Sequence, residues 1–166
     1  MSAFKLTSAT LLACTLTLGL SGTAHADNNL TSYKANAQQL LTTLEKHGEK
    51  VEAQAHQLVE LSKPLLADFK ARYPQCTEYL DALDQAADTM ADLPLAEIES
   101  GYHSDGKLPP LPDANCYHAK DLLVHPATVE AMAKIGLKTP ADWKQAQAEI
   151  EEVIEHFAQV ELAYSE

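Results

Sequence analysis

Residues 30–73 read LTSYKANAQQLLTTLEKHGEKVEAQAHQLVELSKPLLADFKARY, and their apolar residues recur at helical spacing. One set repeats every seven residues and a second set interleaves with it, so that the two together form one apolar stripe. The first set is Ala37, Leu44, Val51, Leu58 and Leu65, and the second is Leu41, Gly48, Ala55, Ser62 and Phe69. The pattern predicts one long helix or two stacked helices, with a kink before Pro64.

The rest of the chain predicts further helices and no strand. Proline and glycine mark the breaks, and alanine, leucine, glutamate, glutamine and lysine, which favour helix, dominate between them. We expect a helix over 76–93, a long Pro/Gly loop over 101–115, a short helix over 117–124 closed by Pro126, another from Pro126 to Ile135, and a last helix that begins at Thr139-Pro140. The predicted fold is all-α, an antiparallel helical bundle of three substantial helices plus one or two short helices.

The N-terminus has the features of a cleaved signal peptide. Lys5 precedes a short apolar run, and Ala24 and Ala26 form the small-x-small pattern that signal peptidase recognises. We therefore expect residues 1–26 to be removed and residues 27–166 to form a single helical domain in the periplasm or outside the cell. A lipid anchor at Cys14 is the alternative. No later segment is apolar enough to span a bilayer.

Acidic residues outnumber basic ones in the chain as a whole. The whole sequence carries 12 Lys and Arg against 24 Asp and Glu, a net charge of −12. Such a chain repels nucleic-acid phosphates and anionic lipid headgroups, so we expect no nucleic-acid partner. An acidic balance suits a cationic ligand, and it also keeps an exported protein dispersed.

Cys76 and Cys116 are the two cysteines that follow the predicted cleavage site. Two thiols in an oxidising compartment most simply pair, so the sequence predicts a disulfide between them. Cys116 is then a structural half-cystine rather than a nucleophile or a metal ligand.

The stretch CYHAKDLLVHP, residues 116–126, holds the candidate metal site. His118, Asp121 and His125 share one face of a helix, and His103 lies in the preceding loop. Two imidazoles and a carboxylate suit zinc, copper or non-haem iron. The alternative is that these are ordinary surface residues, with His125 at a frayed helix end. A haem held by His47 and Met90 is a further alternative, and His156 is interpreted as a surface partner of Glu152.

No catalytic motif is present, so we do not expect an enzyme. The leading hypothesis is an exported periplasmic binding protein that holds a divalent transition metal or small cation at His103, His118, Asp121 and His125. The alternative is a structural or protein-interaction module of the cell envelope, with an envelope partner or a second copy of the chain and no small-molecule ligand.

Overall fold

The computed structural model of the protein describes residues 21–165, and the regular structure in that range is entirely helical. The α-helices are α1 (Ser21–Glu45), α2 (Val51–Arg72), α3 (Thr77–Met90), α4 (Leu95–Ile98), α5 (Ala114–Ile135) and α6 (Pro140–Ser165). A 3-10 turn, η1 (Pro74–Cys76), precedes α3, and a π-helical turn, η2 (Glu99–His103), follows α4. The prediction of an all-α fold is confirmed.

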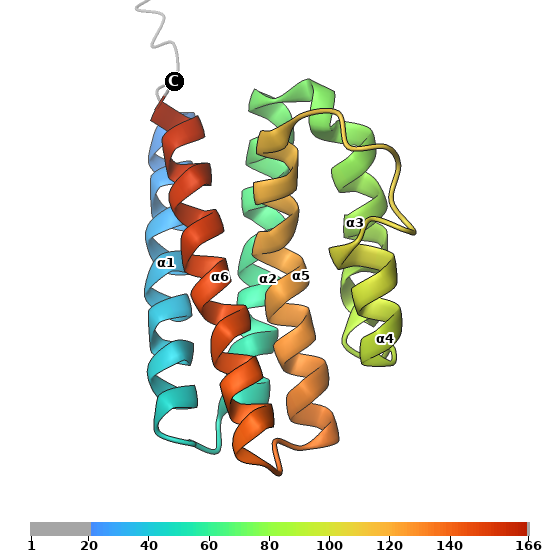
Figure 1. Cartoon of the computed structure of the whole chain (residues 1–166). Helices are drawn as coiled ribbons and strands as arrows, with labels where there is room; N and C mark the ends of the chain where they lie inside the picture. The colour runs from blue at the N-terminus through green and yellow to red at the C-terminus, as the bar shows by residue number, and fades with distance from the viewer. Residues whose placement is uncertain (1–20, 166) are drawn as a thin grey trace, which may run out of the picture.

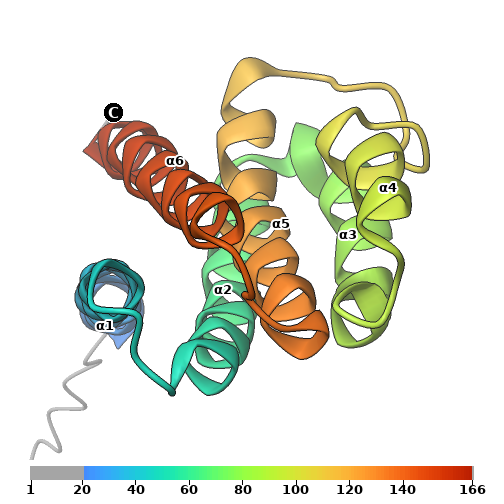
Figure 2. The same ribbon diagram turned by 60° about the horizontal axis from the view of Figure 1, so that its bottom comes forward.

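Four long helices surround the core. α1 packs against α2 and α6, and α5 packs against the same two helices from the other side. Taken in chain order, α1, α2, α5 and α6 run in alternating directions (Figure 1). α3 and α4 lie on the side of α5 that faces away from α1, as both views show (Figures 1 and 2). α5 therefore has neighbours on nearly every side.

Residues 30–73 form two helices, joined by a turn at residues 46–50. His47 has a positive φ of 52°, and the amide of Gly48 donates to the carbonyl of Thr43 at 2.9 Å. Left-handed backbone ends a helix, which is why the apolar stripe divides here. Gly48 thus belongs to the turn, whereas Ala55 and Ser62 of the same predicted set are buried in α2.

The predicted break at Pro126 is wrong, because α5 continues through it to Ile135. Proline lacks an N–H, so the carbonyl of Leu122, four residues earlier, loses its helical partner. The hydroxyl of Tyr33, from α1, donates to this carbonyl at 2.5 Å, and Tyr33 is fully buried. A tertiary hydrogen bond thus compensates for the missing one, and the two short helices expected over 117–135 are one long helix, α5.

The disulfide between Cys76 and Cys116 is confirmed. It joins the end of η1 to the first turn of α5. Part of the predicted loop is helical, because η2 contains residues 99–103 and α5 begins at Ala114, with the Asp113 side chain accepting from the amide of Asn115 as its cap. The predicted start of the last helix is confirmed, since Thr139 accepts from the amide of Asp142.

The predicted signal peptide lies mostly outside the described residues, as does Cys14. The predicted cleavage point after Ala26 falls within α1, which begins at Ser21. Between residues 21 and 165, none of the helices combines the length and the apolar character needed to cross a membrane.

Candidate metal centre

α5 carries an unusual number of polar side chains into the interior. Because other helices surround it, residues on several of its faces are buried, including Lys120, Asp121, His125, Thr128 and Glu130. Buried polar groups are costly unless they are paired, so each needs a partner. Four of these five side chains have a hydrogen-bond or ion-pair partner of good geometry, and the fifth lies at the centre of the candidate site.

Asp121 is that fifth residue. Its side chain is 1% exposed, yet neither carboxylate oxygen accepts a hydrogen bond of good geometry, and the donors beside it are Lys120 and the Tyr117 hydroxyl. Lys120 Nζ lies 3.4 Å from Oδ1, but it donates to the carbonyls of Tyr102 and His103 and to the Asp105 carboxylate. An ammonium has three donors, and these three contacts use all of them. Asp121 therefore has an ionic contact with Lys120, but Lys120 donates no hydrogen bond of good geometry to it.

Two imidazoles face Asp121, and a second carboxylate lies beside one of them. His156 Nε2, from α6, lies 3.3 Å from Asp121 Oδ2, and His125 Nε2 lies 3.9 Å from Oδ1. Glu152, also from α6, places Oε2 3.6 Å from His125 Nε2. Asp121 and His125 are four residues apart on α5, and Glu152 and His156 are four residues apart on α6. Each helix thus presents one carboxylate and one imidazole on the face that meets the other.

Each of these two histidines has a partner on its other ring nitrogen. His125 Nδ1 lies 2.7 Å from Glu149 Oε2, and His156 Nδ1 lies 2.9 Å from His118 Nδ1. An ionised carboxylate only accepts, so His125 Nδ1 carries a proton and donates it to Glu149. One of the Nδ1 atoms of His156 and His118 donates to the other, and when His156 is the donor its Nε2 presents a lone pair toward Asp121.

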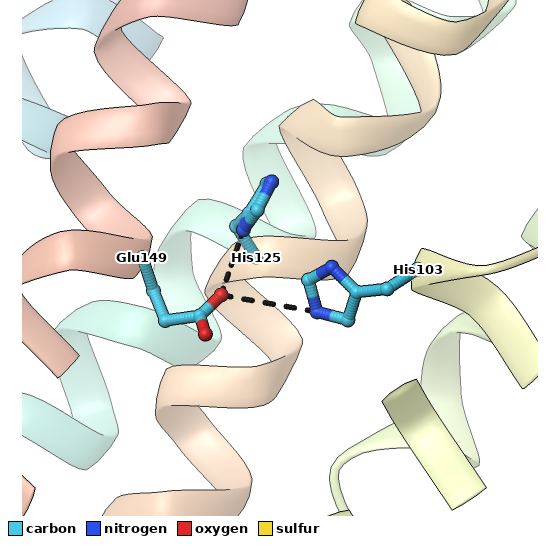
Figure 3. A group of neighbouring side chains, drawn as sticks. All are labelled: His103, His125 and Glu149. Carbon is cyan, nitrogen blue, oxygen red and sulfur yellow. Dashed lines mark hydrogen bonds and ion pairs between the residues drawn. The ribbon is translucent and has the colours of Figure 1, made fainter. Parts of the chain in front are cut away.

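His103 approaches the same cluster from η2. Figure 3 shows one oxygen of the Glu149 carboxylate turned toward both the His125 and the His103 rings, which come from different elements. His103 Nε2 lies 3.8 Å from Glu149 Oε2 and 2.9 Å from the Thr128 hydroxyl, which itself donates to the carbonyl of Val124. The group His103, His125 and Glu149 can also surround an ion. Its members are already hydrogen-bonded, unlike Asp121.

Burial lowers the pKa of three of the histidines. The pKa of His156 falls to about 4, because of burial and then of the neighbouring His125 and His118. Burial likewise lowers the pKa of His103 and of His118. Neutral imidazoles have a lone pair, so these rings can act as acceptors or ligands at neutral pH.

The spacing of the donor atoms suits a metal ion. Ligand atoms about 2.1 Å from a tetrahedral zinc ion lie about 3.4 Å apart. His156 Nε2 and His125 Nε2 lie 3.3 and 3.9 Å from oxygens of Asp121, Glu152 Oε2 lies 3.6 Å from His125 Nε2, and the donor atoms of Asp121, His125 and His156 all lie within 4.8 Å of one another. Side-chain movements of up to about 1 Å would bring these three residues to the spacing that one ion needs.

The four residues predicted from the sequence are all in this region, in different positions. Asp121 and His125 belong to the group whose donor atoms converge with that of His156. His118 instead contacts Nδ1 of His156, and His103 lies beside Glu149. His125 is in the middle of α5 rather than at a frayed end, because the helix continues through Pro126.

Sequence reasoning missed Lys120, Glu149 and the role of His156. His156 was expected on the surface, but its side chain is 15% exposed and points toward α5 residues. The repeated spacing of Asp121 and His125, and of Glu152 and His156, was a signal that could have paired the two segments. No local pattern indicates that Lys120 is buried, since lysine is rarely enclosed.

Other titratable residues have separate surroundings. His47 lies in the α1–α2 turn and stacks on Trp143, with ring centroids 4.5 Å apart, whereas Met90 ends α3. The acidic row of α3 pairs with lysines: Lys70 contacts Asp81 and Asp84, and Lys63 contacts Asp88.

No protein-family model, curated protein or solved structure matches this chain. The candidate metal centre therefore depends on its own geometry.

Proposed function

We propose that the protein is an exported periplasmic binding protein, an antiparallel helical bundle that holds a divalent transition metal between α5 and α6. The ligands are Asp121, His125 and His156, whose donor atoms converge, and the exposed Glu152, which lies 3.6 Å from His125 Nε2, is the fourth. One observation carries the proposal: an enclosed carboxylate, whose oxygens have no hydrogen bond of good geometry, faces the Nε2 atoms of two histidines.

A cation between these groups removes the cost of the buried charge. Asp121, Glu149 and Glu152 bring three carboxylates to the interface of α5 and α6, and the nearest cation, Lys120, is already paired with Asp105. A divalent ion would bind the free oxygens of Asp121 directly. The same ion would bind the nitrogen atoms of the two imidazoles, so it would link the carboxylate to both rings.

The donor set selects the class of metal. Nitrogen from imidazole and oxygen from carboxylate suit Zn²⁺, Cu²⁺, Ni²⁺, Fe²⁺ and Mn²⁺, whereas Cu⁺ prefers thiolate and thioether. Both cysteines of the described region are in the disulfide, so no thiolate contributes there. Calcium and magnesium prefer a site made of oxygen alone.

The outer contacts support a metal site rather than a chance cluster. Metal-bound histidines usually donate their second N–H to a carboxylate, a carbonyl or water, and this fixes the ring and makes it a stronger ligand. Glu149 takes this role for His125 and His118 takes it for His156. The network of His103 and Thr128 lies behind Glu149.

Export is supported by the apolar N-terminal sequence and by the disulfide, which persists in an oxidising compartment. The alternative of an interaction module predicts an exposed apolar strip on the first helix. The large exposed apolar residues among the described side chains, Leu111, Tyr117, Ile135 and Leu162, are elsewhere and scattered.

Zinc titration of metal-free protein by calorimetry tests the proposal. We expect one tightly bound ion per chain, and at least a hundredfold weaker binding in Asp121→Asn, which keeps the shape of the side chain but not its charge. His156→Gln should weaken binding comparably. His103→Ala should leave the stoichiometry at one, since His103 is not a ligand.

The matched controls are Glu151→Gln, an exposed neighbour of Glu152 on α6, and His56→Gln, a histidine outside the cluster. Circular dichroism confirms that each variant is folded. No tight binding in the wild type, or equal affinity in Asp121→Asn, would rule out the proposed function. A second ion that is lost in His103→Ala would instead place a metal at His103, His125 and Glu149.

A further inference from the structure

The four proposed ligands differ sharply in exposure. The side chains of Asp121 and His125 are 1% and 4% exposed, and that of His156 is 15% exposed. Glu152 is 56% exposed. Three donors are therefore enclosed by the interface of α5 and α6, whereas the fourth reaches the ion from the solvent side.

The enclosed donors are also held in place, and Glu152 is not. Glu149 holds His125 in place and His118 holds His156 in place. Asp121 lies beside Lys120, whose three N–H groups all donate to other acceptors. The charged partner found for Glu152 within the described chain is His125 Nε2 at 3.6 Å, which is too long for a hydrogen bond. An exposed glutamate has considerable rotamer freedom, and fixing it on a metal removes that freedom.

Charge balance permits the exchange of Glu152 for a small anion. Asp121, Glu149 and Glu152 together outweigh the charge of a divalent ion, and Lys120 is paired with Asp105. A monoanion carries the same charge as the carboxylate that leaves, so a one-for-one exchange leaves the net charge of the site unchanged.

We propose that the metal centre has one exchangeable coordination position, at Glu152, which accepts a small monoanion with a single donor atom. This inference rests on the proposed metal site. Structural metal sites are closed by four protein ligands, whereas reactive sites have three and leave one position to water or substrate. The arrangement of Asp121, His125 and His156 corresponds to the second kind once Glu152 swings out.

Cobalt(II) and azide test this inference. Co²⁺ replaces zinc at nitrogen and oxygen sites, and its visible absorption reports the coordination of the ion. We load the protein, with its disulfide intact, with Co²⁺ and titrate it with sodium azide. We expect a saturable change in the visible bands, and a several-fold tighter azide affinity in Glu152→Gln because the competing carboxylate is gone. Glu151→Gln should behave as the wild type.

The outcomes separate the two proposals. Visible cobalt bands that azide does not change would show a closed site and overturn the inference while leaving metal binding intact. Loss of cobalt binding in Glu152→Gln would overturn it as well, because Glu152 would then be an obligatory ligand. If the wild type binds neither cobalt nor zinc, the proposed function and the inference both fail.

Discussion

Single residues on α5 and α6 carry the chemistry through their surroundings. Burial raises the pKa of Asp121, while Lys120 and then His125 act against that shift. Burial also lowers the pKa of His156, His118 and His103, so it disfavours the charged form of both kinds of donor. A metal ion suits both, because it stabilises the carboxylate charge and accepts the imidazole lone pairs.

We predict that acid destabilises the metal-free protein partly through His156. The pKa of His156 is about 4 in the folded chain against 6.5 for an ordinary histidine. The unfolded chain therefore binds a proton at a higher pH than the folded chain does. Stability from this group is complete above about pH 6.5 and is lost as the pH falls toward 4.

Proton NMR of the metal-free protein measures the titration of His156 directly. Urea unfolding at several pH values should show a smaller loss of stability across this range in His156→Gln than in the wild type. A His156 resonance that titrates near pH 6.5 would contradict the prediction. His56→Gln, which removes an exposed histidine, is the matched control.

At the level of elements, α5 is the helix on which the fold and the site both depend. Its continuation through Pro126 places His125 in the interior rather than at a helix end. The bond from Tyr33 to the Leu122 carbonyl supports that continuation, because it satisfies the carbonyl that proline leaves free. α1 thus stabilises a helix that carries the proposed ligands.

A double-mutant cycle of Tyr33→Phe and Pro126→Ala tests this support. Tyr33→Phe should lower the free energy of unfolding by about 1–3 kcal/mol, because a buried carbonyl loses its partner. In the Pro126→Ala background, the amide at position 126 can donate to Leu122, so the same substitution should cost less. Equal costs in the two backgrounds, measured by urea unfolding, would refute the role assigned to Tyr33.

For the molecule as a whole, the disulfide ties the η1–α3 junction to the start of α5. The two cysteines are 40 residues apart, and both are fully buried. The loop between them carries η2 and hence His103, while Lys120 bonds to the carbonyls of Tyr102 and His103 and holds the end of that loop on α5. The covalent link and the lysine act on the same segment.

We predict that removal of the disulfide lowers the free energy of unfolding by about 4 kcal/mol, as expected when a loop of about 40 residues is no longer closed in the unfolded chain. The Cys76→Ser, Cys116→Ser double variant, compared with the oxidised wild type by urea unfolding, measures the change. The wild type in reducing agent provides a check that needs no substitution. An unchanged unfolding midpoint in both would contradict the prediction.

Much of the helical layout was predictable. The apolar period of residues 30–73, the cap at Thr139 and the pair Cys76 and Cys116 are local or compositional signals, and each matches the structure. Pro126 misled the prediction, because a proline ends most helices unless a distant group compensates. Tyr33 is that group, and no residue near Pro126 in the sequence indicates that Tyr33 will contact the Leu122 carbonyl.

The candidate site was predictable only in part. His103, His118, Asp121 and His125 were found because they are close together in the chain. Glu149, Glu152 and His156 are on another helix, and whether they face α5 or solvent depends on how α6 is rotated and shifted against it.

The amino-acid pattern alone thus establishes a helical protein with a disulfide, because helix periodicity, caps and cysteine pairing depend on residue type and short spacing. The meeting of Asp121 and His125 with Glu152 and His156 emerges only when α5 and α6 pack. That packing buries the apolar faces of both helices, and the polar residues beside those faces come into contact as a result.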